Sequence, residues 1–179
     1  MPTIILGRDG VINQTSTEHI KSADEWHALP GSLPAIARLS QNGYHVVVAT
    51  NQAGLASGRL TIEGLVSINQ KMLSHLAQYG GVIEAIFFCP AGVRDKNSDC
   101  RKPNPTMFID ITSRLRANLA DVPCVGDKLS DLQAARAAGA KPVLVRTGHG
   151  EKLVRQKKVP EGVAIYDNLA EFVNELLAN

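Results

Sequence analysis

The sequence has few of the features that characterise secreted, membrane or nucleic-acid-binding proteins. Its three cysteines, Cys89, Cys100 and Cys124, are an odd and sparse set, so we expect reduced thiols rather than a disulfide scaffold. No apolar run approaches the roughly 20 residues that span a bilayer, and the short apolar stretch after Met1 is not typical of a signal peptide. The 19 basic and 17 acidic residues are dispersed, which gives only a weak field for nucleic acid. We expect a cytoplasmic monomer with no nucleic-acid or membrane partner.

The chain does contain a regular alternation of short apolar runs and longer segments with helical periodicity. Its 179 residues suit one domain, and this alternation is typical of a parallel sheet that is buried on both faces. The expected strands are 4–6, 45–49, 85–89, 123–125, 142–145 and 164–166. The pattern therefore predicts an α/β fold.

Helices are expected between these strands. One begins at Ser32 as a cap, with Pro34 in its first turn, another runs from Thr61 to Gly80, and others cover 106–119, 129–138 (stopped by Gly139) and 169–177. The helix from Thr61 is expected to bury one face, formed by Ile62, Leu65, Ile68, Met72, Leu73 and Leu76. Trp26 is interpreted as a packing residue, and His45, His75 and His149 as structural or solvent-facing histidines. Residues 90–105 lack periodicity and are predicted to form a long surface loop.

Polar residues follow four of the predicted strands, at the positions where parallel α/β sheets bind ligands. They are Gly7, Arg8, Asp9 and Gly10; Thr50, Asn51 and Gln52; Arg101 and Lys102; and Asp127, Lys128 and Asp131. A phosphomonoester is a dianion, so attack on it needs a cation, a lysine and hydrogen-bond donors. Asp127 is suited to hold Mg²⁺, and Lys102 and Thr50 are suited to contact phosphoryl oxygens. Asp9 is placed to act as general acid and base.

These segments resemble the four motifs of the haloacid dehalogenase-like phosphohydrolases, in the branch of the heptose-bisphosphate 7-phosphatases and the histidinol phosphatases. The resemblance rests on residues 8–13, 49–54, 100–103 and 125–127 and extends over nearly the whole chain. It implies one domain over 1–179, with a three-layer Rossmann-like parallel sheet and no large cap domain. It also implies that Asp127 and the backbone carbonyl of Asp9 hold Mg²⁺. The residues implied to bind substrate are Arg8, Asp9, Thr15, Ser16, Glu18, His19, Thr50, Asn51, Gln52, Arg101, Lys102 and Lys128.

The sequence departs from this family at residue 7. The family places there an aspartate that attacks the phosphate, forms a phosphoaspartyl intermediate and ligates Mg²⁺, whereas this chain has Gly7. Asp9 cannot replace the missing carboxylate, since it lies two residues on and must serve as acid and base. Loss of a covalent nucleophile costs many orders of magnitude in rate. We therefore predict negligible hydrolysis of phosphate esters and weakened Mg²⁺ binding.

A second departure lies in loop 90–105, which corresponds to the zinc-binding loop of the family. Relatives bind zinc through Cys-x-His and Cys-x-Cys, whereas this chain keeps Cys89 and Cys100 and has Ala91 and Ser98 at the other two positions. A closed structural zinc site normally needs four ligands, so zinc binding is not expected. Without zinc, we expect a mobile loop and a less well organised phosphate grip.

Three functions remain open from the sequence. The resemblance favours Mg²⁺-dependent removal of the 7-phosphate of a heptose 1,7-bisphosphate, in the supply of activated heptose for bacterial surface polysaccharide, with Gly7 opposing turnover. One alternative is a catalytically silent phosphosugar-binding or interaction module that keeps Thr50, Arg101 and Lys102. The other is a phosphatase for a different small phosphomonoester, such as histidinol phosphate.

Overall fold

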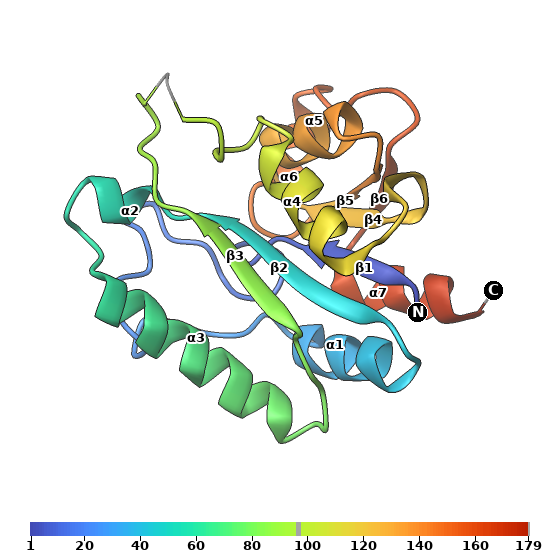
Figure 1. Cartoon of the computed structure of the whole chain (residues 1–179), viewed down its shortest axis with the longest axis horizontal. Coiled ribbons are helices and arrows are strands. Elements are labelled where there is room, and N and C mark those ends of the chain that lie inside the picture. The colour runs from blue at the N-terminus through green and yellow to red at the C-terminus, as the bar shows by residue number, and fades with distance from the viewer. Residues whose placement is uncertain (96–97, 179) are drawn as a thin grey trace.

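Short apolar strands form a parallel sheet through the centre of the molecule, in a computed structural model that describes residues 1–95 and 98–178 (Figure 1). The strands are β1 (Thr3–Leu6), β2 (His45–Asn51), β3 (Ala85–Cys89), β4 (Pro123–Gly126), β5 (Lys141–Val145) and β6 (Ala164–Tyr166). They form one sheet in the order β3-β2-β1-β4-β5-β6, and every neighbouring pair is parallel. The predicted α/β fold is confirmed, because each expected strand is present at its place in the chain.

Helices cover both faces of the sheet and bury its alternating side chains (Figure 1). On one face, α1 (Ser32–Gln41), α3 (Ile62–Ala77) and α7 (Leu169–Ala178) pack over Ile4 and Leu6 of β1. On the other face, α4 (Thr106–Leu115) and α5 (Leu129–Ala137) pack over Ile5. Because successive residues of a strand point to opposite faces, one strand contributes to both cores. The sheet is thus held rigidly between two helical layers.

The two helix starts that the sequence predicts have different origins. Ser32 is not a cap, because Gly31, with a left-handed φ of 76°, precedes the helix and the Ser32 hydroxyl donates to the carbonyl of Ile12. The hydroxyl therefore ties α1 to the segment after β1. Thr61 does cap α3, since its side-chain oxygen accepts a hydrogen bond from the backbone N–H of Gly64 at 3.0 Å.

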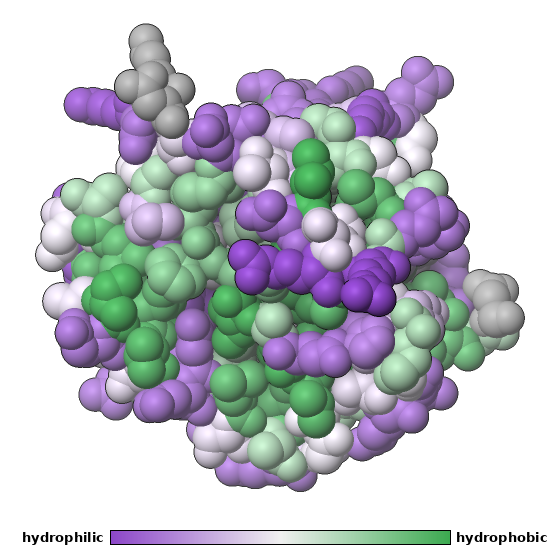
Figure 2. Space-filling view, in the orientation of Figure 1, coloured by the Kyte–Doolittle hydropathy of each residue, from purple (hydrophilic) through white to green (hydrophobic). Residues whose placement is uncertain are grey.

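Helix α3 buries a narrower stripe than the sequence predicts. The buried residues are Leu65, Ile68, Met72 and Leu76, whereas Ile62 and Leu73 are 53% and 37% exposed. At 100° per residue, Ile62 and Leu73 lie roughly a quarter turn from the centre of the stripe. Together with Val66 and Phe88 they contribute exposed apolar surface over α3 and the edge strand β3, where Figure 2 shows hydrophobic residues gathered.

Several helix ends and short helices differ from the expected ones. Helix α4 ends at Leu115, earlier than predicted, because Arg116 adopts a left-handed φ of 52°, and a 3₁₀ turn (Leu119–Asp121) follows. Gly139, with a φ of 80°, terminates α5 as predicted. The short helices α2 (Ala53–Ala56) and α6 (Gly150–Arg155) were missed, because they are too short to show a helical period. In the described part of the chain, no helix is long and apolar enough to cross a membrane.

The three histidines and Trp26 have the packing or surface roles that the sequence predicts. Trp26 is 1% exposed, and its ring meets that of His75 edge to face at 5.8 Å. His45 pairs with Glu84 at the surface. His149 has a different environment, described with the site below.

The described part of loop 90–105 contains neither helix nor strand, as predicted, and a disulfide joins Cys89 before it to Cys100 near its end. Their Cα atoms are 5.5 Å apart. The expectation of reduced thiols is therefore wrong for this pair: an odd cysteine count prevents complete pairing but not a single bridge. Cys124 is free and buried, and burial raises the pKa of its thiol. Lys96 and Asn97 of the loop lie outside the described residues.

The disulfide predicts a specific thiol count. Titration of the denatured, unreduced chain should find only the thiol of Cys124, and reduction should release all three thiols. Cys100→Ser should lower the free energy of unfolding by about 2–4 kcal/mol in non-reducing buffer, because the cross-link restricts the unfolded chain. The same substitution should have a much smaller effect in reducing buffer. Three thiols in the unreduced chain would contradict this account.

Candidate active site

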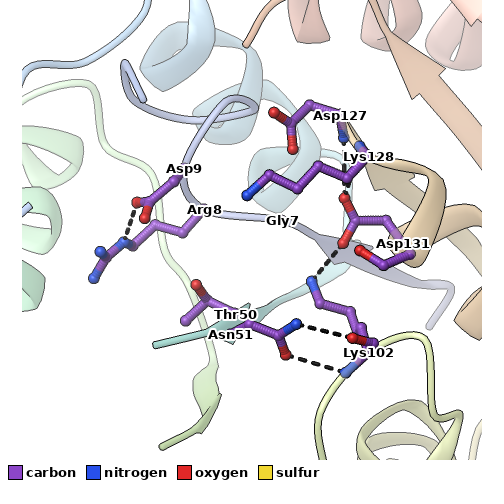
Figure 3. Close-up of a pocket in the computed structure, with 10 residues that line it drawn as sticks. Gly7, Arg8, Asp9, Thr50, Asn51, Lys102, Asp127, Lys128 and Asp131 are labelled. Carbon is purple, nitrogen blue, oxygen red and sulfur yellow. Dashed lines mark hydrogen bonds and ion pairs between the residues drawn. The ribbon is translucent and has the colours of Figure 1, made fainter. Parts of the chain in front are cut away.

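The carboxyl ends of the central strands surround a polar hollow of about 40 Å³ (Figure 3). The end of β2, the segments after β1 and β4, and the end of loop 90–105 contribute its walls. The lining residues are Gly7, Arg8, Asp9, Thr50, Asn51, Lys102, Asp127, Lys128, Ser130 and Asp131. Residues from all four sequence segments that were expected to converge are therefore neighbours in space.

Gly7 continues β1 into the floor of this hollow in an ordinary backbone conformation. Its N–H donates to the carbonyl of Val125 in β4 at 2.8 Å, so its position is fixed by the sheet. A Cβ at residue 7 would lie 3.1 Å from Cγ2 of Val11 and 3.5 Å from the carbonyl oxygen of Val125. The contact with Val11 is tight, so a Cβ here requires Val11 to shift by a few tenths of an ångström.

Lys102 is held from several directions. Its ammonium donates to the carboxylate of Asp131 at 2.7 Å and to the backbone carbonyl of Ala49 at 2.8 Å. The side-chain amide of Asn51 brackets the Lys102 backbone, accepting from its N–H and donating to its carbonyl, each at 3.2 Å. Only 5% of Lys102 is exposed. Its positive charge is therefore fixed at the edge of the hollow.

Asp131 is the counter-ion of this buried ammonium. One oxygen of its carboxylate pairs with the ammonium of Lys102. The other oxygen accepts hydrogen bonds from the backbone N–H groups of Asp127 and Lys128, at 3.2 and 3.0 Å. Burial alone would raise the pKa of the Asp131 carboxyl, but the Lys102 ammonium, together with the charge and the backbone N–H of Lys128, holds it below its usual value. Asp131 thus joins the start of α5 to the end of loop 90–105.

Asp127 occupies a narrow crevice beside the hollow. Its carboxylate lies against the backbone of Gly10 and Gly148, at φ values of 86° and 60°, where a Cβ on either glycine would overlap it. The same carboxylate oxygen accepts the backbone N–H of His149 and lies 2.9 Å from its Nδ1. His149 is half-exposed, as expected for a structural or solvent-facing histidine, and it also contacts this carboxylate.

Asp9 is paired with its neighbour Arg8 rather than with the lysines. One oxygen of its carboxylate accepts from Nε of Arg8 at 2.8 Å and from the amide of Asn13 at 3.0 Å. Burial would raise the pKa of Asp9, but the Arg8 guanidinium and the Asn13 amide hold it below its usual range. Figure 3 shows this pair on the side of the hollow away from Lys102 and Asp131. The guanidinium of Arg8 is 1% exposed and also donates to Asn69.

Some residues expected to contact substrate lie outside the lining of this hollow. Gln52 is buried and donates to the hydroxyl of Thr50 at 2.8 Å, so it orients Thr50. Arg101 lines a separate hollow of about 350 Å³ that shares Lys102 with the first. The segment expected to close over the sugar does not line either hollow; its residues are Thr15, Ser16, Glu18 and His19.

Three of the four positions that correspond to the zinc ligands of the family lie close together in this structure. The hydroxyl of Ser98 lies 3.6 Å from the sulfur of Cys89 and 3.5 Å from that of Cys100. Ala91 occupies the fourth zinc-loop position. Its carbonyl accepts a hydrogen bond at 3.2 Å from Arg101, the residue after Cys100. Within residues 1–95 and 98–178, no group of three or more His, Cys, Asp or Glu side chains is placed to hold a metal ion. The two remaining cysteines pair with each other here.

Three contributions to the site were not assigned from the sequence. Ser130 lines the hollow, His149 contacts Asp127, and Asp131 was named beside the fourth segment without a role. An acidic residue in the first turn of a helix, three residues after the cap position, is a known capping signal and could have identified Asp131. His149 gave no comparable signal, since it is 22 residues from Asp127.

Comparison with known proteins places this geometry in a family. Residues 99–172 match the HAD-hydrolase-like family. A D-glycero-beta-D-manno-heptose-1,7-bisphosphate 7-phosphatase from Bordetella bronchiseptica is 53% identical over 177 residues, covering 99% of this chain and 98% of the relative. One from Pseudomonas putida is 45% identical and covers 99% and 100%.

Solved structures give the same result. The B. bronchiseptica phosphatase, crystallised with magnesium and phosphate, has a TM-score of 0.96 and 53% identity, covering 99% of each chain. The D,D-heptose 1,7-bisphosphate phosphatase from Burkholderia thailandensis has a TM-score of 0.80 and 41% identity, covering 100% of each chain.

Removal of the Asp131 charge should destabilise the site and the fold together. Asp131→Asn leaves the buried ammonium of Lys102 without its counter-ion, so the free energy of unfolding should fall by about 3–5 kcal/mol at neutral pH. Affinity for inorganic phosphate should fall as well, because Lys102 loses its fixed position. Urea denaturation and calorimetric titration with phosphate measure the two effects.

The same pair predicts a pH dependence. Because the pKa of Asp131 is lowered on folding, its contribution to stability is present above the ordinary value of 3.8 and is lost as the pH falls below it. Asp131→Asn should lack that part of the acid sensitivity. Asp110→Asn, on the exposed side of α4, is the matched control and should change stability by less than about 0.5 kcal/mol. Equal stability of the two variants would contradict the role of the ion pair.

Proposed function

This chain belongs to the family of D-glycero-beta-D-manno-heptose-1,7-bisphosphate 7-phosphatases, within the HAD-like hydrolases, and from that premise we propose a function for it. Its hollow binds the 7-phosphate of a heptose 1,7-bisphosphate but does not hydrolyse it at an enzymatic rate. The observation that supports this proposal is a polar hollow lined by Lys102, Thr50 and Asp127 that has Gly7, and no carboxylate, at position 7.

The lining suits a phosphate dianion. The ammonium of Lys102 and the side chain of Lys128 supply positive charge, and the hydroxyl of Thr50, oriented by Gln52, supplies a hydrogen-bond donor. Preorganised groups of this kind stabilise the charge on phosphoryl oxygens at little reorganisation cost. These groups are present whatever residue occupies position 7.

Asp9 is a poor substitute for the missing nucleophile. Its carboxylate is engaged by Arg8 and Asn13, on the side of the hollow away from Lys102 (Figure 3). We assign Asp9 the role of general acid and base. Its carboxyl is ionised in the free protein, and a phosphate dianion brought beside it would raise its pKa and favour the protonated form.

The residues present fit a magnesium ion. Asp127 lines the hollow with a buried carboxylate, and Mg²⁺ prefers hard oxygen donors. We propose that Asp127 and the backbone carbonyl of Asp9 would hold the ion, with one carboxylate fewer than an aspartate at position 7 would provide. When bound, the ion supplies charge neutralisation for the phosphoryl oxygens.

Arg101 is suited to the distal part of the substrate. It lines the neighbouring hollow of about 350 Å³, which meets the first at Lys102. One of its nitrogens is held by the carbonyl of Ala91, and burial lowers the pKa of its guanidinium. The planar guanidinium can contact a second phosphate or sugar hydroxyls with its remaining donors. This division of contacts favours a bisphosphorylated sugar over a compact monophosphate.

Restoring a carboxylate at position 7 is the direct test. Gly7→Asp should raise the rate of phosphate release from the heptose bisphosphate, in the presence of Mg²⁺, by at least about 10⁴-fold over the unchanged chain. Its Cβ requires a shift of Val11 by a few tenths of an ångström. Inorganic phosphate release, measured by a colorimetric assay, provides the readout.

Gly7→Asn is the matched control, because it has nearly the shape of aspartate but no nucleophilic carboxylate. It should remain as inactive as the unchanged chain. If the unchanged chain matches Gly7→Asp in rate, the proposed lack of turnover is wrong. Revival of Gly7→Asp on histidinol phosphate but not on the heptose bisphosphate would instead identify a different substrate.

A further inference from the structure

The turn that follows β5 lies against two of the segments that line the hollow. Strand β5 is the neighbour of β4 in the sheet, so the carboxyl ends of these two strands lie side by side. Arg146, the first residue after β5, donates its backbone N–H to the carbonyl of Tyr166 in β6 at 2.8 Å, which ties the start of the turn to the sheet. Residues 147–149, here called the β5 turn, are thereby placed beside Gly10 and Asp127.

The two oxygens of the Asp127 carboxylate have different surroundings. Oδ2 accepts the backbone N–H of His149 at 2.9 Å and lies 2.9 Å from its Nδ1. A Cβ on Gly10 or on Gly148 would come within 2.1 or 2.3 Å of the same oxygen, so Oδ2 is enclosed by two glycine backbones. No hydrogen bond to Oδ1 is found among residues 1–95 and 98–178, and Figure 3 shows the carboxylate facing the hollow. Oδ1 is therefore the oxygen that is available to a cation.

His149 determines this difference between the two oxygens. A carboxylate only accepts hydrogen bonds, so Nδ1 of His149 carries the hydrogen in its contact with Asp127. The backbone donor and the ring donor of one residue thus hold the same oxygen. Rotation of the carboxylate would break both hydrogen bonds. The His149 side chain is 48% exposed, so its ring supplies this contact without belonging to the core.

Thr147 acts on the segment that carries the second proposed magnesium donor. Its hydroxyl donates to the carbonyl of Gly10 at 2.7 Å, and the N–H of Gly10 donates to the carbonyl of Asn13, also at 2.7 Å. Gly10 is thereby held through both its N–H and its carbonyl. It directly follows Asp9, whose backbone carbonyl is the other donor proposed for the ion. Thr147 therefore restricts the peptide that presents this carbonyl.

We propose that Thr147 and His149 are positioning residues for the magnesium ion. His149 orients the carboxylate of Asp127 so that Oδ1 faces the ion, and Thr147 fixes the backbone carbonyl of Asp9 through Gly10. This inference rests on the proposed function, since it needs a metal ion at the donors assigned there. Hydrogen-bond partners of metal ligands typically contribute about 10–100-fold to metal affinity. The β5 turn is thus a fifth segment of the site.

Titration with Mn²⁺, followed by EPR of the free ion, tests the proposal, because Mn²⁺ accepts the same oxygen donors as Mg²⁺. His149→Leu removes the ring donor, whereas His149→Asn keeps an N–H donor at the δ position. Thr147→Val removes the hydroxyl with little change of shape, whereas Thr147→Ser keeps it. Neither residue lines the hollow. Each variant is also made in the Gly7→Asp chain, where a further carboxylate strengthens metal binding.

His149→Leu and Thr147→Val should each weaken Mn²⁺ binding by about 10-fold or more in both backgrounds. His149→Asn and Thr147→Ser should restore most of the lost affinity, because they restore the hydrogen bonds. Urea unfolding without metal, measured on the same variants, reports stability separately. A loss of stability with unchanged Mn²⁺ affinity would overturn the inference, because the two residues would then be structural only.

The other outcomes are equally decisive. Tighter binding by His149→Leu would overturn the inference, because the ring would then compete with the ion for Asp127. An equal loss in His149→Leu and His149→Asn would also overturn it and would identify the ring as a direct ligand. Equal Mn²⁺ affinity of the unchanged chain and all four variants would leave the proposed function standing without these positioning residues. If neither the unchanged chain nor Gly7→Asp binds Mn²⁺, the proposed magnesium site itself is wrong, and the inference falls with it.

Discussion

The buried ion pair between Lys102 and Asp131 is the interaction on which the organisation of the site depends. It joins a residue at the end of loop 90–105 to the first turn of α5, and the same carboxylate orders the backbone of Asp127 and Lys128. Asn51 completes the arrangement by bracketing the Lys102 backbone. Three segments that are distant in sequence are thereby locked around one hollow, and none of these contacts involves residue 7.

This independence explains how the site can keep its shape with glycine at position 7. The backbone of Gly7 is fixed by its hydrogen bond to β4, so the floor of the hollow stays in place. What changes is charge, because the hollow has one carboxylate fewer than it would have with an aspartate at position 7. Under the proposed function, the hollow attracts anions more strongly and lacks a side chain at position 7 to attack them. Binding and turnover are separable in this architecture.

The fold was predictable from the sequence, but much of the detail around the site was not. The strands and the convergence of Asp9, Thr50, Lys102 and Asp127 follow from local patterns, because parallel strands present their carboxyl ends at one edge. Contacts between distant residues left no local signal. His149 on Asp127 and the bridge between Cys89 and Cys100 emerge only when the chain is folded. The exposed Ile62 and Leu73 show that periodicity predicts a buried face only approximately.

The central claim is that this chain binds a phosphorylated heptose without cleaving it. Phosphorus NMR of the unchanged chain, mixed with Mg²⁺ and less than one equivalent of heptose 1,7-bisphosphate, observes binding and cleavage together. The account predicts that the 7-phosphate resonance shifts or broadens on binding and remains that of an intact ester for hours. Conversion of the 7-phosphate to inorganic phosphate within minutes would contradict it.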